Sequence, residues 1–478
     1  MLSTEEIKKF IDDDNASTKK QKAKIGLRYY EGEHDIKDYQ IYYVNDAGEL
    51  VPDGNRSNIT ISHPFFTELI DQCAQYELSG KDCIVKSDDP KLQRELESYF
   101  DDEFMMELSD LITYAKVEGD SFLYRYVDEN FKTRFAFADG LSVVEVPKKY
   151  SKDGEDYVIY YYFDRTEDDK DIFKVQVWDK EQVHYYKMID STISEDDEVE
   201  INPRPHVIYE ENEERYYDTF GEVPFLRLDN NRKRKSDLFV IKDLIDDYDL
   251  MACGLSNNLQ DVAEGIYVVK GWQGDSLDDL TRNIKAKKQV AVGENGDLDI
   301  KTINVPYMAR VTKMVEDEKN IYRFGMGFNT AQMGDGNVTN VVIRSRYALL
   351  DLKCNKLEMQ LKRLMKKVIK IVIDEINENN GTNFSYNDCW VDIKREIMTN
   401  ATDNAHIELV NAQKEQVKIG TLLSLAQALD QETVVKGICD VLDINYEDIK
   451  GKLPKPQTPE QQVEDAMTEL NNLEDADE

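Results

Sequence analysis

A glycine-rich stretch raises the first question of chemistry in this sequence. The segment GMGFNTAQMGDGNVTN runs from Gly325 to Asn340 between two long helical patterns. Glycine-rich loops that open onto a helix often cradle phosphate, but a Walker-type loop follows a strand and ends in Lys and then Ser or Thr. This segment follows a helical pattern and has no Lys before Lys353. Nucleotide binding is therefore disfavoured, and a mobile loop between two helices is the simpler interpretation.

The other residue types that carry chemistry form no recognisable motif. Acidic runs such as DDDNAS and FDDE do not match the spacing of a calcium-binding EF-hand loop, and hydrolase signatures such as G-x-S-x-G are absent. No two histidines have the H-x-x-x-H spacing, since the five are His34, His63, His184, His206 and His406. We therefore expect no metal, no cofactor and no enzymatic activity. The chain has 96 acidic residues, so their number alone does not exclude a glycosidase-type pair of carboxylates. A carboxylate-dependent hydrolase is therefore kept as a minor alternative.

Composition and charge narrow the class of protein. The chain has 478 residues and a net charge of −36, which is far too acidic for a protein that wraps nucleic acid by neutralising phosphates. The six cysteines are scattered without a C-x-x-C pair, which favours buried, reduced thiols in an intracellular setting. No apolar run approaches the roughly 18 residues that span a bilayer, and the N-terminus has no signal-peptide core. We expect no membrane association and no export.

Helical and turn patterns fill the N-terminal quarter of the chain. Ser3 and Glu6 form a capping box at the start of the first helix, and Pro64 suits the first turn of a later one. Helices are expected over residues 1–30, 59–79 and, as two helices, 90–119, with a hairpin around 46–48.

The periodicity changes after Ser121. Stretches such as SFLYRYVD, YVIYYYFD and FKVQVWD alternate polar and apolar residues up to Arg227 and are rich in Tyr, Phe and Val. This pattern predicts antiparallel strands of a meander, with the aromatic residues forming ordinary sheet core.

The second half of the chain returns to helices around a small insert. Apolar residues recur at helical spacing from Asp237 to Val262, and the opposite face is acidic. The segment 265–305 reads as strand, short helix and strand, and Pro306 then opens a helix to Phe324. Further helices are expected over 341–379 and 401–450, with a returning strand in FSYNDCWVDIKRE between them. Cations in NRKRKSD and along 341–379 are expected to pair with carboxylates of neighbouring elements or subunits.

This order of parts resembles the portal proteins of tailed bacteriophages, of the type found in long-tailed phages of Gram-positive hosts. The stretches that carry the resemblance are RYYEGEHDI at 28–36, NRSNITISHPFFTELIDQCAQYELSG at 55–80 and the most specific one, VPFLRLDNNRKRKSDLFVIKDLIDDYDLMACGLSNNLQD at 223–261. The resemblance covers about residues 20–450, although SHPFF stands where a basic-apolar stretch is more usual.

The resemblance implies an α+β portal architecture, with long stem and wing helices, a β-rich wing, a small α/β clip and a helical crown. Its parts would be a wing at 1–235, stem helices at 236–264 and 306–325, a clip at 265–305, a tunnel loop at 326–340, a long wing helix with a returning strand at 341–399, a crown at 400–455 and an acidic tail at 456–478, which is expected to be disordered.

The resemblance also implies site residues. Those facing the channel from the stem would be among Asp243, Asp246, Asp247 and Asp249. The apolar stripe of the same helix would pack between neighbouring subunits. Tunnel-loop residues near DNA would be Asn329, Thr330, Gln332, Met333, Gly334, Asp335, Gly336 and Asn337. Clip residues meeting the motor or adaptor would be Trp272, Asp275, Asp278, Glu294 and Asn295.

The partners implied are other copies of the chain in a ring, usually of twelve subunits, the terminase large subunit, a head-completion or adaptor protein, and the major capsid and scaffolding proteins. Double-stranded DNA would pass without sequence specificity, in a virion whose portal assembles in the host cytoplasm. The acidity fits this function, because a channel must let a polyanion slide instead of holding its phosphates. An acidic scaffold or adaptor that binds protein partners through its tail is the other alternative.

Overall fold

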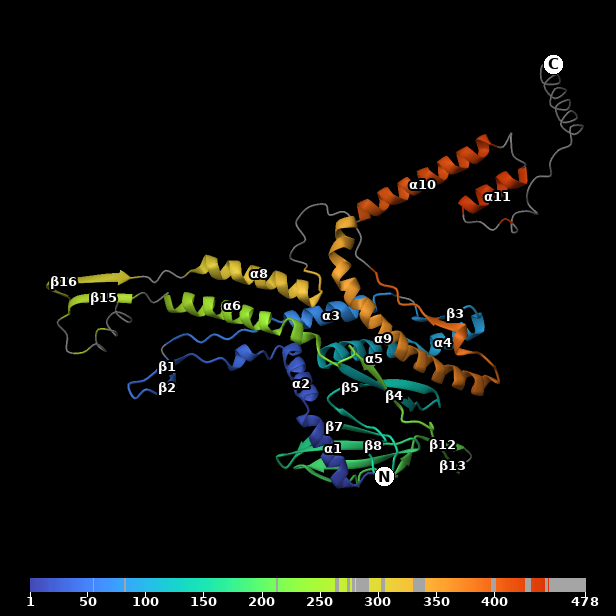
Figure 1. The fold of residues 1–478 in the computed structure, drawn as a ribbon, viewed down its shortest axis with the longest axis horizontal. Coiled ribbons are helices and arrows are strands. Elements are labelled where there is room, and N and C mark those ends of the chain that lie inside the picture. Colours follow the sequence, from blue (N-terminus) through green and yellow to red (C-terminus); the bar gives the residue numbers. More distant parts are fainter. Residues whose placement is uncertain are drawn as a thin grey trace, which may run out of the picture. The chain divides into compact units, whose positions relative to one another are not determined.

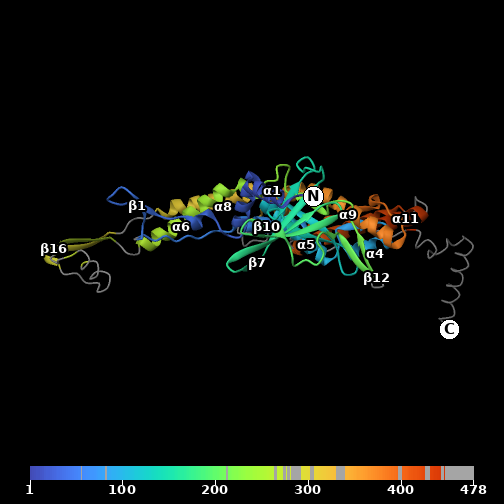
Figure 2. The ribbon, with the colours of Figure 1, turned by 90° about the horizontal axis from the view of Figure 1, so that it is seen from below.

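The computed structural model describes residues 1–54, 56–80, 83–211, 214–262, 266–272, 276, 280, 292–301, 306–329, 340–396, 401–425, 431–442 and 446. Helices and antiparallel strands are both abundant, as expected for an α+β fold (Figures 1 and 2). The chain divides into two compact units, one of Met1–Gly336 with Arg344–Ile397 and one of Asn337–Ile343 with Met398–Glu478.

The elements have the following bounds. The helices are α1 Thr4–Ala16, α2 Thr18–Tyr30, α3 Phe65–Glu77, α4 Pro90–Tyr99, α5 Asp102–Glu118, α6 Lys242–Val262, α8 Tyr307–Gly325, α9 Asn340–Asn380, α10 Ala401–Ser424 and α11 Gln431–Val441. The strands are β1 Tyr42–Val44, β2 Leu50–Pro52, β3 Val85–Ser87, β4 Asp120–Val127, β5 Thr133–Asp139, β6 Val143–Val146, β7 Tyr157–Glu167, β8 Lys170–Trp178, β9 Gln182–Ile189, β10 Thr192–Glu195, β11 Arg204–Pro205, β12 Val207–Glu211, β13 Glu214–Asp218, β14 Phe225–Asp229, β15 Ile266–Trp272, β16 Val292–Lys301 and β17 Cys389–Val391.

The first expected helix is two helices. The capping box is confirmed, because the Glu6 amide donates to Ser3 Oγ and the Ser3 amide donates to the Glu6 carboxylate. The helix then breaks at Ser17, whose hydroxyl accepts from the Lys20 amide at 3.2 Å and so caps α2. A serine that can accept such a bond competes with helix continuation, which explains the break.

The helix expected over 59–79 is shorter. α3 begins at Phe65, with Pro64 as its N-cap residue. The residues before it are extended and bound to α6, where the Ile59 amide donates to Asn257 Oδ1 at 2.7 Å. Tertiary hydrogen bonds therefore replace the intrahelical ones in this segment.

The strands do not form one meander. β14, β4 and β5 make one antiparallel sheet, and β10, β9, β8, β7 and β6 make another, in which β11 also pairs with β9. The chain leaves the first sheet at a turn in which the Ser142 amide donates to Asp139 at 2.7 Å. Strands β6 to β10 are consecutive neighbours in the second sheet and follow the expected meander order, whereas β12 and β13 pair in a third sheet.

The largest hydrophobic core lies against α9. Leu357, Leu361 and Val368 are buried there with Leu108 and Leu111 of α5. The long helix and the returning strand are both confirmed, since β17 pairs antiparallel with β3.

The first part of the stem helix differs from expectation. A 3-10 turn, Asp237–Val240, precedes α6. Leu238, Ile241 and Ile245 are at most 2% exposed and pack against Tyr29 and other residues of this chain. This part of the apolar stripe is therefore unavailable to a neighbouring subunit, contrary to the prediction.

The insert between α6 and α8 and the C-terminal helices agree in part with the predicted secondary structure. β15 and β16 pair antiparallel, whereas most of the short helix expected between them lies outside the described residues. In the second unit α10 and α11 pack together, with Gly437 against Leu422. The acidic tail lies outside the described residues.

Gly26 offers a test of the packing of α2 on α5. A Cβ at this position would lie 2.1 Å from the Val117 carbonyl oxygen, whereas one at Gly420 of α10 would meet nothing within 4 Å. Gly26→Ala should lower the free energy of unfolding by about 2 kcal/mol, because backbone has to move. Gly420→Ala, the helical control, should leave it unchanged or raise it by up to about 1 kcal/mol. Denaturant unfolding of both variants measures this, and equal stability of the two would contradict the close packing.

Candidate functional site

The two helices predicted to form a stem, α6 and α8, pack side by side and antiparallel (Figure 1). Gly254 of α6 lies beside Arg310 of α8, and Asp247 lies beside Lys313 further along the pair. The Lys313 ammonium contacts both Asp247 and the buried Asp317 of its own helix. One cation thereby neutralises a carboxylate on each helix and ties the pair together.

The four stem aspartates have different environments. Asp243 is exposed, and Asp247 is 38% exposed and paired with Lys313. Asp246 accepts a hydrogen bond from the Tyr29 hydroxyl and pairs with Lys242 at 2.7 Å. The structure thus leaves Asp243 as the stem aspartate most open to solvent.

Asp249 was predicted, with the other three aspartates, as a candidate for facing a channel, and for Asp249 this prediction is wrong. Its side chain is fully buried. His34 Nδ1 donates to Asp249 Oδ2 at 2.7 Å, and His63 Nδ1 donates to Oδ1 at 2.7 Å. The His63 amide donates to Oδ1 as well, at 3.0 Å. Because both oxygens are engaged inside the fold, Asp249 ties the segment from His34 to His63 onto α6.

We call Asp249 with His34 and His63 the clamp. Its hydrogen bonds set the ionisation state of Asp249. Burial alone raises the pKa of Asp249, but the bonds and charges of His34 and His63 outweigh it and hold the pKa below its usual value. The carboxylate is therefore ionised, as its acceptor role requires. No sequence motif marks this cluster, since its members are far apart in the chain and His34 and His63 fit no ligand spacing.

The start of the glycine-rich loop is anchored on α3. Gln72 donates to the Phe328 carbonyl at 2.9 Å and accepts from the Phe328 amide at 3.0 Å. Cβ atoms at Gly325 and Gly327 would lie 2.6 and 2.0 Å from methyl groups of Leu69. These glycines therefore allow close packing on α3.

The same helix also holds α9, which follows the loop. Cys73 Sγ of α3 lies 3.4 Å from Cys354 Sγ of α9, and both thiols are fully buried. The Phe328 ring stacks on Tyr347 of α9 with centroids 4.6 Å apart. Sequence analysis missed this role of α3, because contacts between side chains so far apart in sequence leave no local pattern.

Most of the predicted loop and clip residues lie beyond what the structure describes. Asn329 is described and donates to Glu318 at 2.9 Å. In the predicted clip, Trp272 pairs with Val292 at the end of the β15–β16 ladder, and Asn295 of β16 is exposed. Glu294 belongs to β16, and only its backbone is described. The predicted residues outside the described ones are Thr330, Gln332, Met333, Gly334, Asp335, Gly336, Asn337, Asp275 and Asp278.

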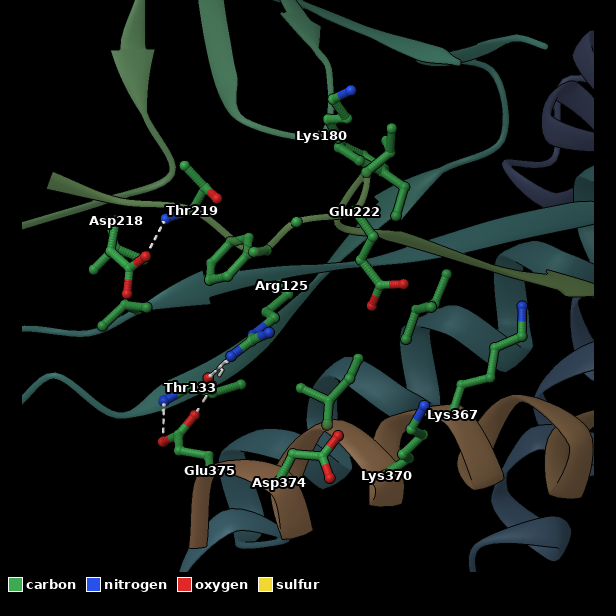
Figure 3. Close-up of a pocket in the computed structure, with 18 of the residues that line it drawn as sticks. Arg125, Thr133, Lys180, Asp218, Thr219, Glu222, Lys367, Lys370, Asp374 and Glu375 are labelled. Carbon is green, nitrogen blue, oxygen red and sulfur yellow. Dashed lines mark hydrogen bonds and ion pairs between the residues drawn. The ribbon is translucent and has the colours of Figure 1, made fainter. Parts of the chain in front are cut away.

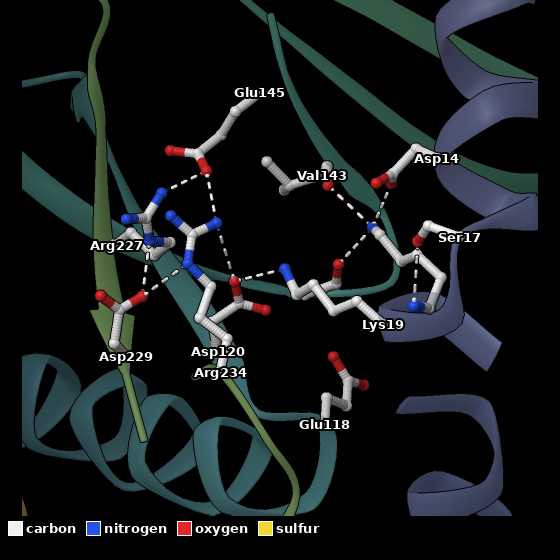
Figure 4. Close-up of polar contacts among 12 residues, drawn as sticks. Asp14, Ser17, Lys19, Glu118, Asp120, Val143, Glu145, Arg227, Asp229 and Arg234 are labelled. Atoms are coloured by element: carbon white, nitrogen blue, oxygen red, sulfur yellow. Dashed lines mark hydrogen bonds and ion pairs between the residues drawn. The ribbon is translucent and has the colours of Figure 1, made fainter. Parts of the chain in front are cut away.

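One cation of the NRKRKSD segment, Arg234, has the structural role that was expected of these cations. Arg234 lies 3.1 Å from Glu145, 3.3 Å from Asp229 and 3.7 Å from the buried Asp120 (Figure 4). Lys19 of α2 also pairs with Asp120. This network joins α2 to both sheets.

A cavity of about 1160 Å³ lies between the strands and α9 (Figure 3). The Arg125 guanidinium donates to Thr133 at 3.0 Å, lies 3.7 Å from Glu375 and stacks over Phe220. Glu375 also accepts from the Thr133 amide and the Tyr99 hydroxyl, each at 2.9 Å. A carboxylate with these partners holds the wall of the cavity in order.

The described residues offer neither a cluster of metal ligands nor a membrane-spanning helix. No group of three or more His, Cys, Asp or Glu side chains there could hold a metal ion. None of the helices described is both long enough and apolar enough to cross a bilayer.

Asp249→Asn tests the clamp. An amide keeps the shape but cannot accept from both histidines as a carboxylate does, so the free energy of unfolding at neutral pH should fall by about 3 kcal/mol. Asp243→Asn, the control on the same helix, should change it by less than about 0.5 kcal/mol because Asp243 is exposed. Chemical denaturation measures both, and equal effects would contradict the clamp.

The pH dependence of the clamp has a definite sign. Because the folded-state pKa of Asp249 is lowered, its stabilisation is present above the unfolded value of about 3.9 and is lost as the pH falls through the folded value. The stability difference between wild type and Asp249→Asn should therefore shrink below about pH 4. A difference that grew on acidification would contradict this assignment.

Comparison with known proteins gives consistent matches. The model of the family described as phage portal protein, SPP1 Gp6-like, matches residues 8–441. The portal protein of Bacillus phage SPP1 is 26% identical over 358 residues, which cover 74% of this chain and 69% of the relative. The portal protein of Clostridium phage phiCD119 is 24% identical over 393 residues, which cover 78% of this chain and 82% of the relative.

Among solved structures, a chain from the virion of a native gene transfer agent particle aligns with a TM-score of 0.36 and 11% identity. The alignment covers 67% of this chain and 86% of that chain.

Proposed function

Because the chain belongs to the SPP1 Gp6-like family of phage portal proteins, we propose that its copies form a closed ring through which double-stranded DNA enters and leaves a capsid. Its role in the virion is a structural, portal one. The family match over residues 8–441 is the observation that carries the proposal. A closed ring of identical subunits requires heterologous contacts, in which different surfaces of each copy meet.

We propose that the parts of the ring are those expected from the resemblance to portal proteins. We assign the wing to residues 1–235 with 341–399, the stem to α6 and α8, the clip to 265–305, the tunnel loop to 326–340 and the crown to 400–455. In support, α6 and α8 form an antiparallel pair whose far ends lead into β15 and β16, and α8 leads into the loop before α9. The clip residues would meet the terminase large subunit and then a head-completion protein. The ring would assemble in the host cytoplasm with capsid and scaffolding proteins.

The pairing of two lysines in the proposed stem supports a conduit. A polyanion slides when the wall offers few cations, because each phosphate contact is a local free-energy minimum. Lys242 and Lys313 are already paired with stem or N-terminal carboxylates. Asp243 remains exposed and is the stem aspartate that we place in the lumen.

Native mass spectrometry of the purified protein tests the ring. We expect one closed assembly, usually of about twelve copies, since heterologous contacts close when the rotation between copies is constant. A protein that stays monomeric over a wide range of salt and concentration would contradict the proposal.

Asp243→Lys tests the lumen. The substitution places one cation per subunit at the wall, so phosphates should be held and the yield of packaged DNA should fall several-fold while rings still form. Asp13→Lys, a charge reversal at an exposed position of α1, is the control and should package normally. Packaging assays with both variants measure this, and normal packaging by Asp243→Lys would remove Asp243 from the lumen.

A further inference from the structure

The helix α9 presents an unusual exposed face. Leu352 and Met359 are 54% and 66% exposed, and the cations that continue the same face are exposed as well. We call this surface the outer face of α9, which consists of Leu352, Lys356, Met359, Arg363, Lys366 and Lys370. The spacing of its members alternates between four and three residues, the repeat at which one helix packs along another.

The side of α9 opposite the outer face is buried in the core, and this keeps the outer face exposed to solvent. Leu357, Leu361, Leu364 and Val368 are at most 3% exposed in the main core. The helix therefore cannot turn to bury Leu352 or Met359. A hollow of about 440 Å³, lined by these two residues with Lys356 and Lys362 among others, lies on the exposed side.

The cations of the outer face are unneutralised within the described part of the chain. Elsewhere on α9, Lys353 lies 3.2 Å from Asp237 and Lys362 lies 2.6 Å from Glu358. No ion pair joins Lys356, Arg363, Lys366 or Lys370 to a carboxylate among the described residues. In a chain of net charge −36, this is a concentration of unpaired positive charge beside exposed apolar side chains.

A surface with both features fits an acidic protein helix that also exposes an apolar residue. Phosphates could neutralise the cations, but they would leave Leu352 and Met359 in contact with water and charge. The chain itself has a matching surface on α5. The acidic face of α5 consists of Asp102, Glu103, Met106 and Asp110, all exposed, with Met106 at 71%.

Within one chain these two faces cannot meet. α5 and α9 both bury their inner sides in the same core, through Leu111 and Leu361. Their exposed faces point away from that core, so contact between them requires two copies.

We propose that the outer face of α9 in one protomer packs against the acidic face of α5 in the next. The contact rests on the proposed ring and names one interface of it. It places Met359 and Leu352 beside Met106, with the cations of α9 opposite the carboxylates of α5. It uses different surfaces on the two copies, as a ring requires.

Charge reversal of the outer face is the first test. In Lys356→Glu/Arg363→Glu/Lys366→Glu, the fraction of chain in rings at about 0.1 M salt should fall at least about tenfold. Mass photometry or native mass spectrometry measures this fraction, and circular dichroism checks the fold of each variant. If the reversal unfolds the chain, the neutral variant Lys356→Gln/Arg363→Gln/Lys366→Gln replaces it. This variant should still lower the fraction of chain in rings, by a smaller factor.

The matched control carries the same change in charge elsewhere. Lys9→Glu/Lys24→Glu/Lys233→Glu alters three exposed lysines away from α9 and should leave the ring fraction close to that of wild type. An equal loss of rings in this control would mean that net charge, and not this face, governs assembly, and would overturn the proposal.

A charge swap identifies the counterpart. Asp102→Lys/Glu103→Lys/Asp110→Lys should weaken the rings by itself, and combining it with the α9 reversal should restore them. Absence of restoration would overturn α5 as the partner surface.

Rings that survive the α9 reversal overturn the interface while leaving the portal function intact. If such rings have lost affinity for double-stranded DNA, the face binds nucleic acid instead. A wild-type chain that forms no ring at all overturns both proposals.

Discussion

The fold depends on the burial of α3, a helix surrounded by other elements along most of its length. Phe66, Leu69, Ile70 and Cys73 are at most 1% exposed. Through them α3 contacts the stem helices, the start of the glycine-rich loop and α9. Its buried Glu77 pairs with Arg395 at 2.9 Å, which offsets part of the cost of burying the carboxylate, although burial still raises the pKa of Glu77. Because interiors are close-packed, a shift of α3 would move all three parts together.

The acidity of the chain is distributed unevenly in space. Some carboxylates, such as Asp120 and Asp249, are buried and hold elements together through cations or histidines. Others, such as Asp243, stay exposed on the stem. Arg234 of NRKRKSD serves the fold, whereas the cations of the outer face of α9 find no carboxylate in the described part of their own chain. The acidic residues therefore serve internal cohesion and, in our proposals, a low affinity for DNA and contact between copies.

Local patterns predicted local structure well. The capping box at Ser3, the hairpin before Pro52, the long α9 and the returning β17 all follow from interactions between residues close in sequence or from strong periodicity. Predictions failed where distant residues decided the outcome. Residues before α3 pair with α6 instead of forming a helix, and the strands divide among three sheets, because pairing partners cannot be read from alternation alone.

By itself, the sequence determined the α+β class, the order of helices and strands, the absence of a phosphate-loop signature and the resemblance to portal proteins. These properties depend on residue type and spacing along the chain. Only the tertiary structure decided which charges are available to solvent. Asp243 and Asp249 lie on the same helix and look alike in sequence, yet one is exposed and the other is enclosed by His34 and His63. Burial and pairing depend on residues brought together from distant parts of the chain, and that information is not local.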